Sequence, residues 1–211
     1  MPTLQKEKED KMDYKDRLKR GQFFIEKCMR SEIEDFVEKH HYSGSINGVK
    51  TPYCFKLTDG ENLIGAMIFG PLGMANAWKK YGEQPEDVME LRRLCLIDET
   101  PKNSESFFIG QALKWLKNNT EIKTIVSYAD PNHGHEGTIY KATNFNHLGM
   151  TAKGKVIWWN GKKYHDRAIR TKYNGKLKPF AIRLKNALEN GEAYYAEQKP
   201  KHIYVFQLRK S

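Results

Sequence analysis

The apolar positions of this chain follow two periodicities, and these predict its secondary structure. Alternation with a period of two, or a short unbroken apolar run, predicts strands. Asp59-Gly60 and Asn160-Gly161 are dipeptides favoured in tight hairpin turns, so each is expected to join two strands. The predicted strand segments are residues 51–58, 62–70, 88–98, 123–130, 155–165 (a hairpin with the second turn at its tip) and 202–208.

A period near 3.6 predicts helices. Residues 31–42 carry apolar positions one turn apart, behind Ser31 as an N-cap. Residues 98–119 begin as a loop and run into an amphipathic helix, with Asn103 or Ser104 available as a cap. The apolar positions of these two helices are Ile33, Phe36, Val37, Ile109, Leu113 and Leu116. The two further helical segments are residues 136–143 and 178–191, the second ending at Gly191.

Together these elements predict an α/β or α+β fold, with a mixed, mostly antiparallel central sheet flanked by helices. With 211 residues the chain is long enough to bury a core as a single domain. Residues 1–20 alternate charges with few apolar positions. They are therefore expected to be frayed, or to form a solvent-facing helix, outside a domain that spans residues 21–211.

Composition narrows the setting in which the protein works. No apolar run approaches the roughly 20 residues that cross a bilayer, and the first 20 residues lack the apolar segment of a secretory signal. Cys28, Cys54 and Cys95 are odd in number and far apart, which favours a reducing compartment over a disulfide framework or a cysteine-built zinc site. We therefore expect a cytoplasmic protein with no membrane partner, and the oligomeric state is left open.

The positive charge of the chain is concentrated near its end. Residues 1–150 hold 21 Lys and Arg against 22 Asp and Glu, a net charge of −1, whereas residues 151–211 hold 15 against 4, a net charge of +11. The two parts account for the +10 of the whole chain. This asymmetry predicts a surface that binds a polyanion, most commonly nucleic acid, and the alternative is a solvated basic segment that serves solubility.

Aromatic residues in the same region favour nucleic acid, because rings beside cations suit unstacked bases and their phosphates. Lys163, His165 and Arg167 alternate along a strand-like segment, where they are expected to line a DNA-contacting edge or else a solvated face. The predicted DNA-binding residues are Trp158, Trp159, Lys162, Lys163, His165 and Arg167.

The stretch SYADPNHGHEGTIY (127–140) is the strongest candidate for chemistry. Asp130 ends an apolar strand, where ligands sit in open sheets, so it is a candidate base or hydrogen-bond acceptor. Its alternative role is to cap the turn that follows. His133 and His135 carry imidazoles that titrate near neutrality, and they are expected either to orient the carboxylate or to lie in solvent.

Two arginines on a predicted strand are further candidates. Arg92 and Arg93 are adjacent, so their side chains face opposite sides of the sheet. One can then reach a phosphate or a donor while the other pairs with an acid such as Glu90.

Two segments resemble the GNAT (N-acetyltransferase) superfamily. GTIYKATNFNHLGMT is similar to its fourth helix and the strand after it, and ELRRLCL with FFIGQALKWL occupies the place of its CoA-binding unit. The resemblance implies a GNAT-like fold and a general-acid role for Tyr140, with simple packing as the alternative. The superfamily's Arg/Gln-x-x-Gly-x-Gly/Ala signature is absent. In its place the loop IDETPKNSES offers Asn103, Ser104 and Ser106 as donors to an anion.

A narrower set of segments resembles the phage Mom family of DNA-modifying proteins. These are HHYSG, LRRLC, PKNSES, SYADPNHGHEGTIYKATN and NGKKYHDR, within about residues 39–170. The resemblance implies action on a flipped adenine of double-stranded DNA, whose N6 receives a carbamoylmethyl-type group that protects phage DNA from host restriction. It also implies that His41 and Tyr42 belong to the active site, with His41 the candidate metal ligand.

The donor and cofactor stay open. Acetyl-CoA or a related small-molecule donor, and divalent iron, are the candidates. An alternative function is an acyl-CoA-dependent N-acetyltransferase acting on protein or RNA, which the glycine-free loop disfavours. A third is a catalytically inactive GNAT-like protein that binds DNA and leaves its nucleosides unchanged.

Overall fold

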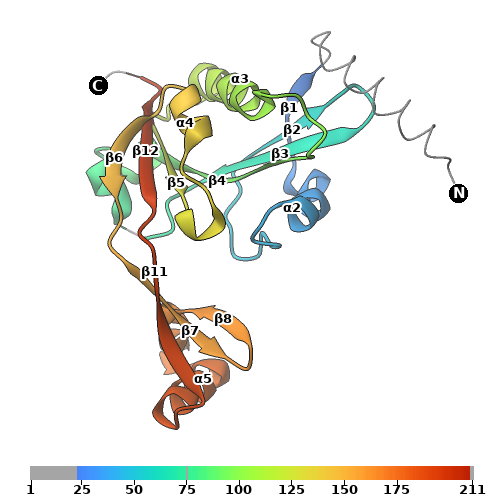
Figure 1. Ribbon diagram of the computed structural model, residues 1–211. Helices are drawn as coiled ribbons and strands as arrows, with labels where there is room; N and C mark the ends of the chain where they lie inside the picture. Colours follow the sequence, from blue (N-terminus) through green and yellow to red (C-terminus); the bar gives the residue numbers. More distant parts are fainter. Residues whose placement is uncertain (1–22, 75, 210–211) are drawn as a thin grey trace, which may run out of the picture. The chain divides into compact units, whose positions relative to one another are not determined.

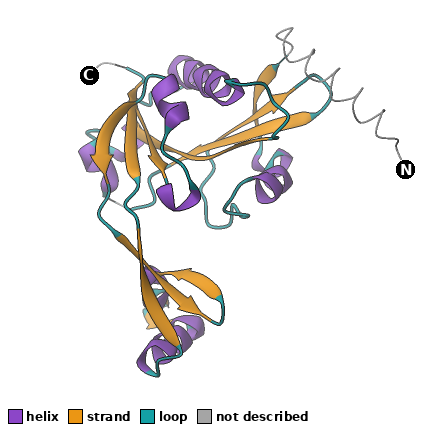
Figure 2. Ribbon diagram, viewed as in Figure 1, coloured by secondary structure: helices purple, strands orange, loops and turns teal. Residues whose placement is uncertain are grey.

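The chain forms two compact units in the computed structural model, which describes residues 23–74 and 76–209 (Figures 1 and 2). The main unit is built from the chain up to residue 128, residues 137–148 and the chain from residue 203. The small unit is built from residues 129–136 and 149–202, so it contains most of the predicted basic region. The predictions for residues 1–20 lie outside the described residues.

A seven-stranded sheet runs through the main unit in the order β1-β2-β3-β4-β5-β12-β6. Neighbours from β1 to β4 pair antiparallel, whereas β4 and β5 pair in parallel. The predicted mixed, mostly antiparallel sheet is therefore confirmed. The strands are β1 (Phe24–Cys28), β2 (Tyr53–Thr58), β3 (Leu63–Gly70), β4 (Val88–Leu96), β5 (Thr124–Ala129), β6 (Asn146–Met150) and β12 (His202–Gln207).

The main-unit helices are α2 (Glu34–His40), α3 (Ser104–Asn119) and α4 (Thr138–Ala142), and Figure 2 shows them in purple around the orange sheet. The apolar positions predicted for the first two helices are mostly buried: Ile33, Val37, Ile109 and Leu116 are fully buried, and Leu113 nearly so. Short 3-10 helices join the larger elements: η1 (Arg30–Glu32), η2 (Ala77–Lys80), η3 (Pro85–Asp87), η4 (Pro131–His133) and η5 (Asp166–Arg170).

Several local predictions need correction. Strand β1 was not expected, and Ser31 lies inside η1 rather than capping α2, whose N-cap position is held by Ile33 without a side-chain hydrogen bond. The expected turn between β2 and β3 does form. Asp59 makes it, because its Oδ1 accepts the backbone N–H of Glu61 at 3.0 Å and of Asn62 at 2.7 Å.

The small unit contains a three-stranded sheet in the order β11-β7-β8, packed on one helix. Asn160 and Gly161 join β7 to β8 with positive φ angles of 49° and 69°, which confirms the predicted hairpin. Helix α5 confirms the predicted helix and ends where Glu192 N–H bonds Ala187 C=O around Gly191, at φ 78°. The elements are β7 (Gly154–Trp159), β8 (Lys162–His165), β9 (Lys172–Tyr173), β10 (Lys176–Leu177), α5 (Pro179–Glu189) and β11 (Ala193–Gln198), the last not expected from sequence.

A buried acid ties the two segments of the small unit together. Asp130 Oδ2 lies 2.8 Å from Lys201 Nζ, and its Oδ1 accepts the N–H of Asn132 at 3.0 Å. Burial alone would raise the pKa of Asp130, but the hydrogen bonds from Lys201 and Asn132 outweigh burial and hold the pKa below its usual range. The ionised carboxylate therefore stabilises the junction of residues 129–136 with residues 199–201.

The first prediction concerns this acid. We expect Asp130→Ala to lower the free energy of unfolding at pH 7 by about 1–3 kcal/mol, because buried donors lose their acceptor. A pKa depressed by folding contributes stability above the unfolded value of about 3.9 and loses it as the pH falls through the folded pKa. The deficit of the variant should therefore shrink as the pH is lowered below about 4 in denaturant titrations followed by tryptophan fluorescence. A deficit that is constant with pH would contradict the ion pair, and the Asp98→Asn variant is the control.

The second prediction concerns Gly137, which precedes α4 with φ +80°. A Cβ there would lie 2.1 Å from Cε2 of the Tyr204 ring, so alanine must displace a buried aromatic side chain. Gly134 has φ +75° and no atom within 4 Å of the same position. Gly137→Ala should therefore destabilise the protein by about 1–3 kcal/mol more than Gly134→Ala, as measured by thermal unfolding. Equal losses would show that only backbone strain matters.

Candidate functional site

Strands β4 and β5 separate part of the way along their length. They pair in parallel only from Val88 with Thr124 to Leu91 with Ser127, and each strand continues beyond this point. Ser127 is fully buried at this fork, and its Oγ donates to the carbonyl oxygen of Leu91 at 3.3 Å. The pairing of β4 with β5 thus ends at a buried polar side chain.

Tyr140 of α4 lies close enough to Ser127 for the serine hydroxyl to act on the pKa of its phenol. Its ring packs against Phe145 and Tyr204, with ring centroids 5.5 and 5.2 Å apart, and only 9% of the residue is exposed. Burial raises the pKa of Tyr140 to about 12, although Ser127 acts in the opposite direction. The phenol therefore keeps its proton at neutral pH and can donate it.

Ser127 was not identified from the sequence. Its signal was a small polar residue inside the apolar run TIVSYA. That signal is weak, because a serine is also found in buried strands where neighbouring side chains leave room only for a small residue. Ser127 becomes a candidate only through its proximity to Tyr140, which lies 13 positions later in the sequence and is brought close by folding.

The loop after α2 places His41 and Tyr42 in the same neighbourhood. His41 is 8% exposed, and its Nδ1 accepts the backbone N–H of Ser43 at 3.1 Å and lies 2.8 Å from Ser43 Oγ. A neutral imidazole with Nδ1 as acceptor carries its proton on Nε2. Tyr42, with its ring 4.3 Å from that of His41, is close enough to contribute to the raised pKa of Tyr140.

Arg92 and Arg93 face opposite sides of β4, as predicted. Arg93 Nη2 donates to Ser45 O at 3.3 Å, on the side of the His41 loop, and burial lowers its pKa while Tyr42 raises it. Arg92 Nη1 donates to Pro71 O at 2.8 Å, and its side chain lines a hollow of about 390 Å³. The Nε atom of each arginine is buried without a hydrogen-bond partner in the described part of the chain.

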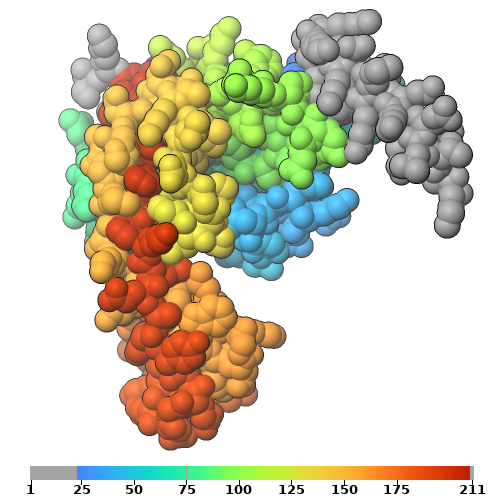
Figure 3. Space-filling view, in the orientation of Figure 1, coloured from blue at the N-terminus to red at the C-terminus, as the bar shows by residue number. Residues whose placement is uncertain are grey.

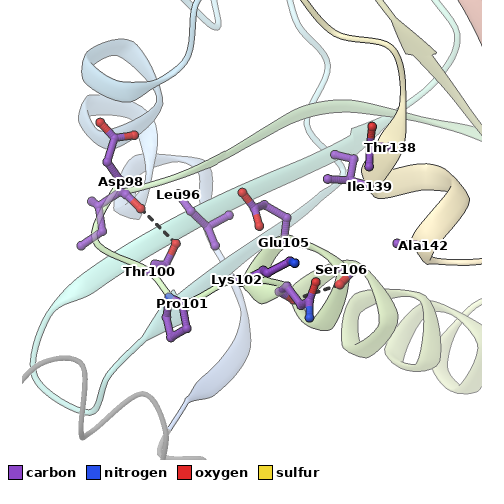
Figure 4. Close-up of a pocket in the computed structure, with 12 residues that line it drawn as sticks. Leu96, Asp98, Thr100, Pro101, Lys102, Glu105, Ser106, Thr138, Ile139 and Ala142 are labelled. Carbon is purple, nitrogen blue, oxygen red and sulfur yellow. Dashed lines mark hydrogen bonds between the residues drawn. The ribbon is translucent and has the colours of Figure 1, made fainter.

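A hollow of about 410 Å³ lies between α3, the loop before it and α4 (Figure 4). Ser104 Oγ donates to Pro101 O at 2.8 Å, and Ser106 Oγ donates to Asn103 O at 2.9 Å. Both hydroxyl protons are therefore engaged by the backbone and not free for an anion. Asn103, at φ 76°, makes no side-chain cap bond with α3.

The hollow is lined by charges of both signs. Glu105 brings a carboxylate and Lys102 an ammonium, and Figure 4 shows the carboxylate of Glu105 between Leu96 and Ile139, whereas that of Asp98 points away from Glu105.

The described residues offer no group of three His, Cys, Asp or Glu side chains able to hold a metal ion. His41, the candidate ligand, is bound to Ser43 through Nδ1. The donor set for divalent iron is thus not assembled from this part of the chain. None of the described helices is long and apolar enough to span a membrane.

Asp130, His133 and His135 belong to the small unit, whereas His41, Tyr42, Arg93 and Tyr140 belong to the main unit. Asp130 caps η4, which is the alternative role foreseen for it. The backbone N–H groups of His133 and His135 both donate to the Asp130 carbonyl, at 3.0 and 3.2 Å. Both imidazoles are exposed.

The predicted DNA-binding residues divide between the two faces of the small sheet. Trp158 and Lys163 pair across β7 and β8 on one face, and Trp159 and Lys162 pair on the other. Trp159 packs in the small core beside Phe180, at 6.2 Å between ring centroids. His165 and Arg167 are exposed, and they bond each other through Nε2 and Nη2 at 3.1 Å.

Comparison with known proteins places this architecture. Arabidopsis thaliana NAA60, solved in complex with acetyl-CoA, superposes with a TM-score of 0.50 over 88% of this chain and 98% of its own, at 9% identity. The ribosomal-protein-S5-alanine acetyltransferase of Vibrio fischeri gives a TM-score of 0.50 over 90% of this chain and 94% of its own, also at 9% identity. At such identities the likeness shows the fold alone, and the fold is that of the GNAT acetyltransferases, as expected.

Sequence comparison is more specific. "Methylcarbamoylase mom" of Escherichia phage Mu is 30% identical over 134 residues, which are 62% of this chain. The match spans about half of that relative, 54% of its length. The model of the Mom protein family matches residues 22–211, so this chain, with a GNAT fold and a buried tyrosine at the fork of its sheet, belongs to the Mom protein family.

Proposed function

We propose that this protein is a phage DNA-modifying transferase that places a small carbamoylmethyl-type group on the N6 amine of adenine and so protects the DNA from host restriction. The observation that carries the proposal is the polar cluster around the β4–β5 fork. It combines a protonated Tyr140, the Arg93 cation and a His41 imidazole with its proton on Nε2. Membership of the Mom family and similarity to the phage Mu methylcarbamoylase support the substrate.

The chemistry requires these groups because the N6 amine of adenine is a poor nucleophile, its lone pair being delocalised into the ring. A bond forms between N6 and the methylene carbon of the group, N6 loses a proton, and the donor's leaving group departs with the bonding electron pair. Tyr140 is proposed to protonate that leaving group, since its high pKa keeps it protonated. Arg93 and the Nε2–H of His41 are proposed to stabilise the charge that develops on the donor.

Asp130 stays the proposed acceptor for the amine proton, with His135 beside it in sequence. Its low pKa keeps it ionised at neutral pH, which suits an acceptor of a hydrogen bond and weakens it as a base. Because Asp130 also ties the small unit together, loss of activity in Asp130→Ala does not separate catalysis from folding. Tyr140 is the sharper position to test.

The donor is proposed to be a small molecule. The alternative, an acyl-CoA-dependent N-acetyltransferase acting on protein or RNA, is disfavoured by the glycine-free loop before α3. The proposed partner is double-stranded DNA, held by the small unit, which carries 13 Lys and Arg against 6 Asp and Glu. A cytoplasmic location follows from such a substrate.

The direct test is mass spectrometry of nucleosides from plasmid DNA recovered after expression in bacteria. We expect a heavier deoxyadenosine with the wild-type protein and a yield lower by about 10²-fold or more with Tyr140→Phe, the range for loss of a general acid. The control variant Tyr81→Phe removes a hydroxyl that interacts with Tyr128, and the yield of modified nucleoside should stay at the wild-type level. DNA that stays unmodified by the soluble wild-type protein would overturn the proposal.

Ser127→Ala tests how Tyr140 is positioned. The variant removes an interaction that lowers the pKa of Tyr140, so this pKa should rise further, and the yield of modified nucleoside should fall by about tenfold. Ultraviolet titration of tyrosines at high pH, compared with Tyr140→Phe, measures the first effect. Ser127→Thr, which keeps a hydroxyl, should recover part of the yield. An unchanged titration would show that Ser127 does not act on Tyr140.

A further inference from the structure

One row of side chains crosses all three strands of the small sheet. Tyr194 of β11 lies directly opposite Trp158 of β7, and Trp158 lies directly opposite Lys163 of β8. Directly paired residues of antiparallel strands project from the same face, so the three side chains stand side by side. Two rings and one ammonium thus form a continuous row.

The other face of this sheet is the one that α5 covers. Ile157 and Ala193 are buried there with Leu184 and Ala187 of α5, and Trp159 packs against this core. Successive strand residues alternate between faces, so the row of Tyr194, Trp158 and Lys163 points away from α5. Figure 3 shows β11 and α5 in red beside β7 and β8 in orange on the surface of the small unit.

The row is exposed although it is aromatic. Tyr194 is 63% exposed and Lys163 is exposed, while Trp158 is partly covered. A tyrosine so exposed beside a tryptophan on a sheet face gains little in folding, because the apolar rings stay in water. The arrangement therefore indicates a contact surface rather than a packing role.

Charge on this face favours a polyanion. The strand residues that share it contribute no carboxylate; they are Gly154, Val156, Trp158, Lys163, His165, Tyr194, Ala196 and Gln198. The acidic residue of these strands, Glu197, pairs with Lys155 on the side of α5. The small unit as a whole carries a net charge of +7, from 13 Lys and Arg and 6 Asp and Glu.

We propose that the row formed by Tyr194, Trp158 and Lys163 binds unpaired nucleotides of a DNA strand, with bases stacked on the two rings and a phosphate at Lys163. Exposed rings stack on the faces of bases, and in a duplex those faces are already covered by neighbouring base pairs. The row therefore prefers a strand that has been opened. This inference rests on the proposed function in taking DNA as the substrate, and it adds the form in which the DNA is held.

An opened strand also fits the reaction. Access to adenine N6 requires the base to leave the stack, at a cost of a few kcal/mol. A surface that binds the unpaired neighbours offsets part of that cost, because stacking contributes roughly 1–3 kcal/mol per base.

The test uses fluorescence anisotropy of the full-length protein with a labelled 20-nucleotide single strand, the same sequence as a duplex, and a duplex with a central mismatched bubble. We expect tighter binding to the single strand and the bubble than to the duplex. Tyr194→Ser should weaken single-strand binding by about 5- to 100-fold, the loss of one stacked base. Tyr195→Ser is the matched control, since Tyr195 is 49% exposed, adjacent in sequence and on the other face. It should change binding less than twofold.

Lys163→Gln gives an independent reading. Loss of one phosphate contact should lower the slope of log K against log salt by about 0.7 for the single strand. Circular dichroism checks that each variant keeps its fold. Equal effects of Tyr194→Ser and Tyr195→Ser, or duplex binding as tight as single-strand binding by the wild-type protein, would overturn the inference.

The same variants separate this inference from the proposed function. Plasmid DNA from cells that express the wild-type protein can carry the modified nucleoside while the Tyr194→Ser variant binds single strands normally. In that case the proposed binding role of the row is wrong and the proposed function stands. Conversely, the Tyr194→Ser variant can lose single-strand binding while plasmid DNA from cells that express the wild-type protein is unmodified. In that case the binding role of the row stands and the proposed function is wrong.

Discussion

The partial pairing of β4 with β5 is the constraint on which the site depends. Where the two strands stop pairing, Ser127 donates to Leu91 O, and its hydroxyl acts on the pKa of Tyr140. One small polar residue thus lies between a strand carbonyl at the fork and the buried phenol of α4.

Side chains at the start of α3 set the polarity of the hollow beside that helix. Glu105 and Lys102 bring charges of opposite sign into its lining. The hydroxyls of Ser104 and Ser106 are already bonded to backbone carbonyls. A shared fold does not by itself specify a ligand, because the groups that contact a ligand differ between proteins of one fold.

The small unit carries the basic part of the chain on a sheet that is covered on one side. Its core is assembled between β7, β11 and α5, and Trp159 belongs to that core. Trp158, the preceding residue, lies on the opposite face beside Tyr194. Two adjacent tryptophans, indistinguishable by composition, thus have different surroundings, and the difference follows from the two-residue period of the strand.

Several features that depend on local sequence pattern were predicted correctly. The helical periodicity predicted α3 and α5, and the Asn160-Gly161 dipeptide predicted the β7–β8 hairpin. Because Arg92 and Arg93 are adjacent on a strand, they were predicted to face opposite sides of the sheet, as they do. The quoted motifs also pointed to the Mom family, which the family model matches over residues 22–211.

Features that depend on pairing between distant segments became visible in the folded chain. Folding brought Ser127 close to Tyr140 and gave Asp130 the partner Lys201, 71 positions later. It also added β1 and β11, whose short polar-rich sequences carry little periodic signal. Strand register and side-chain partners are set by contacts across the fold, and no local window of sequence contains both members of such a pair.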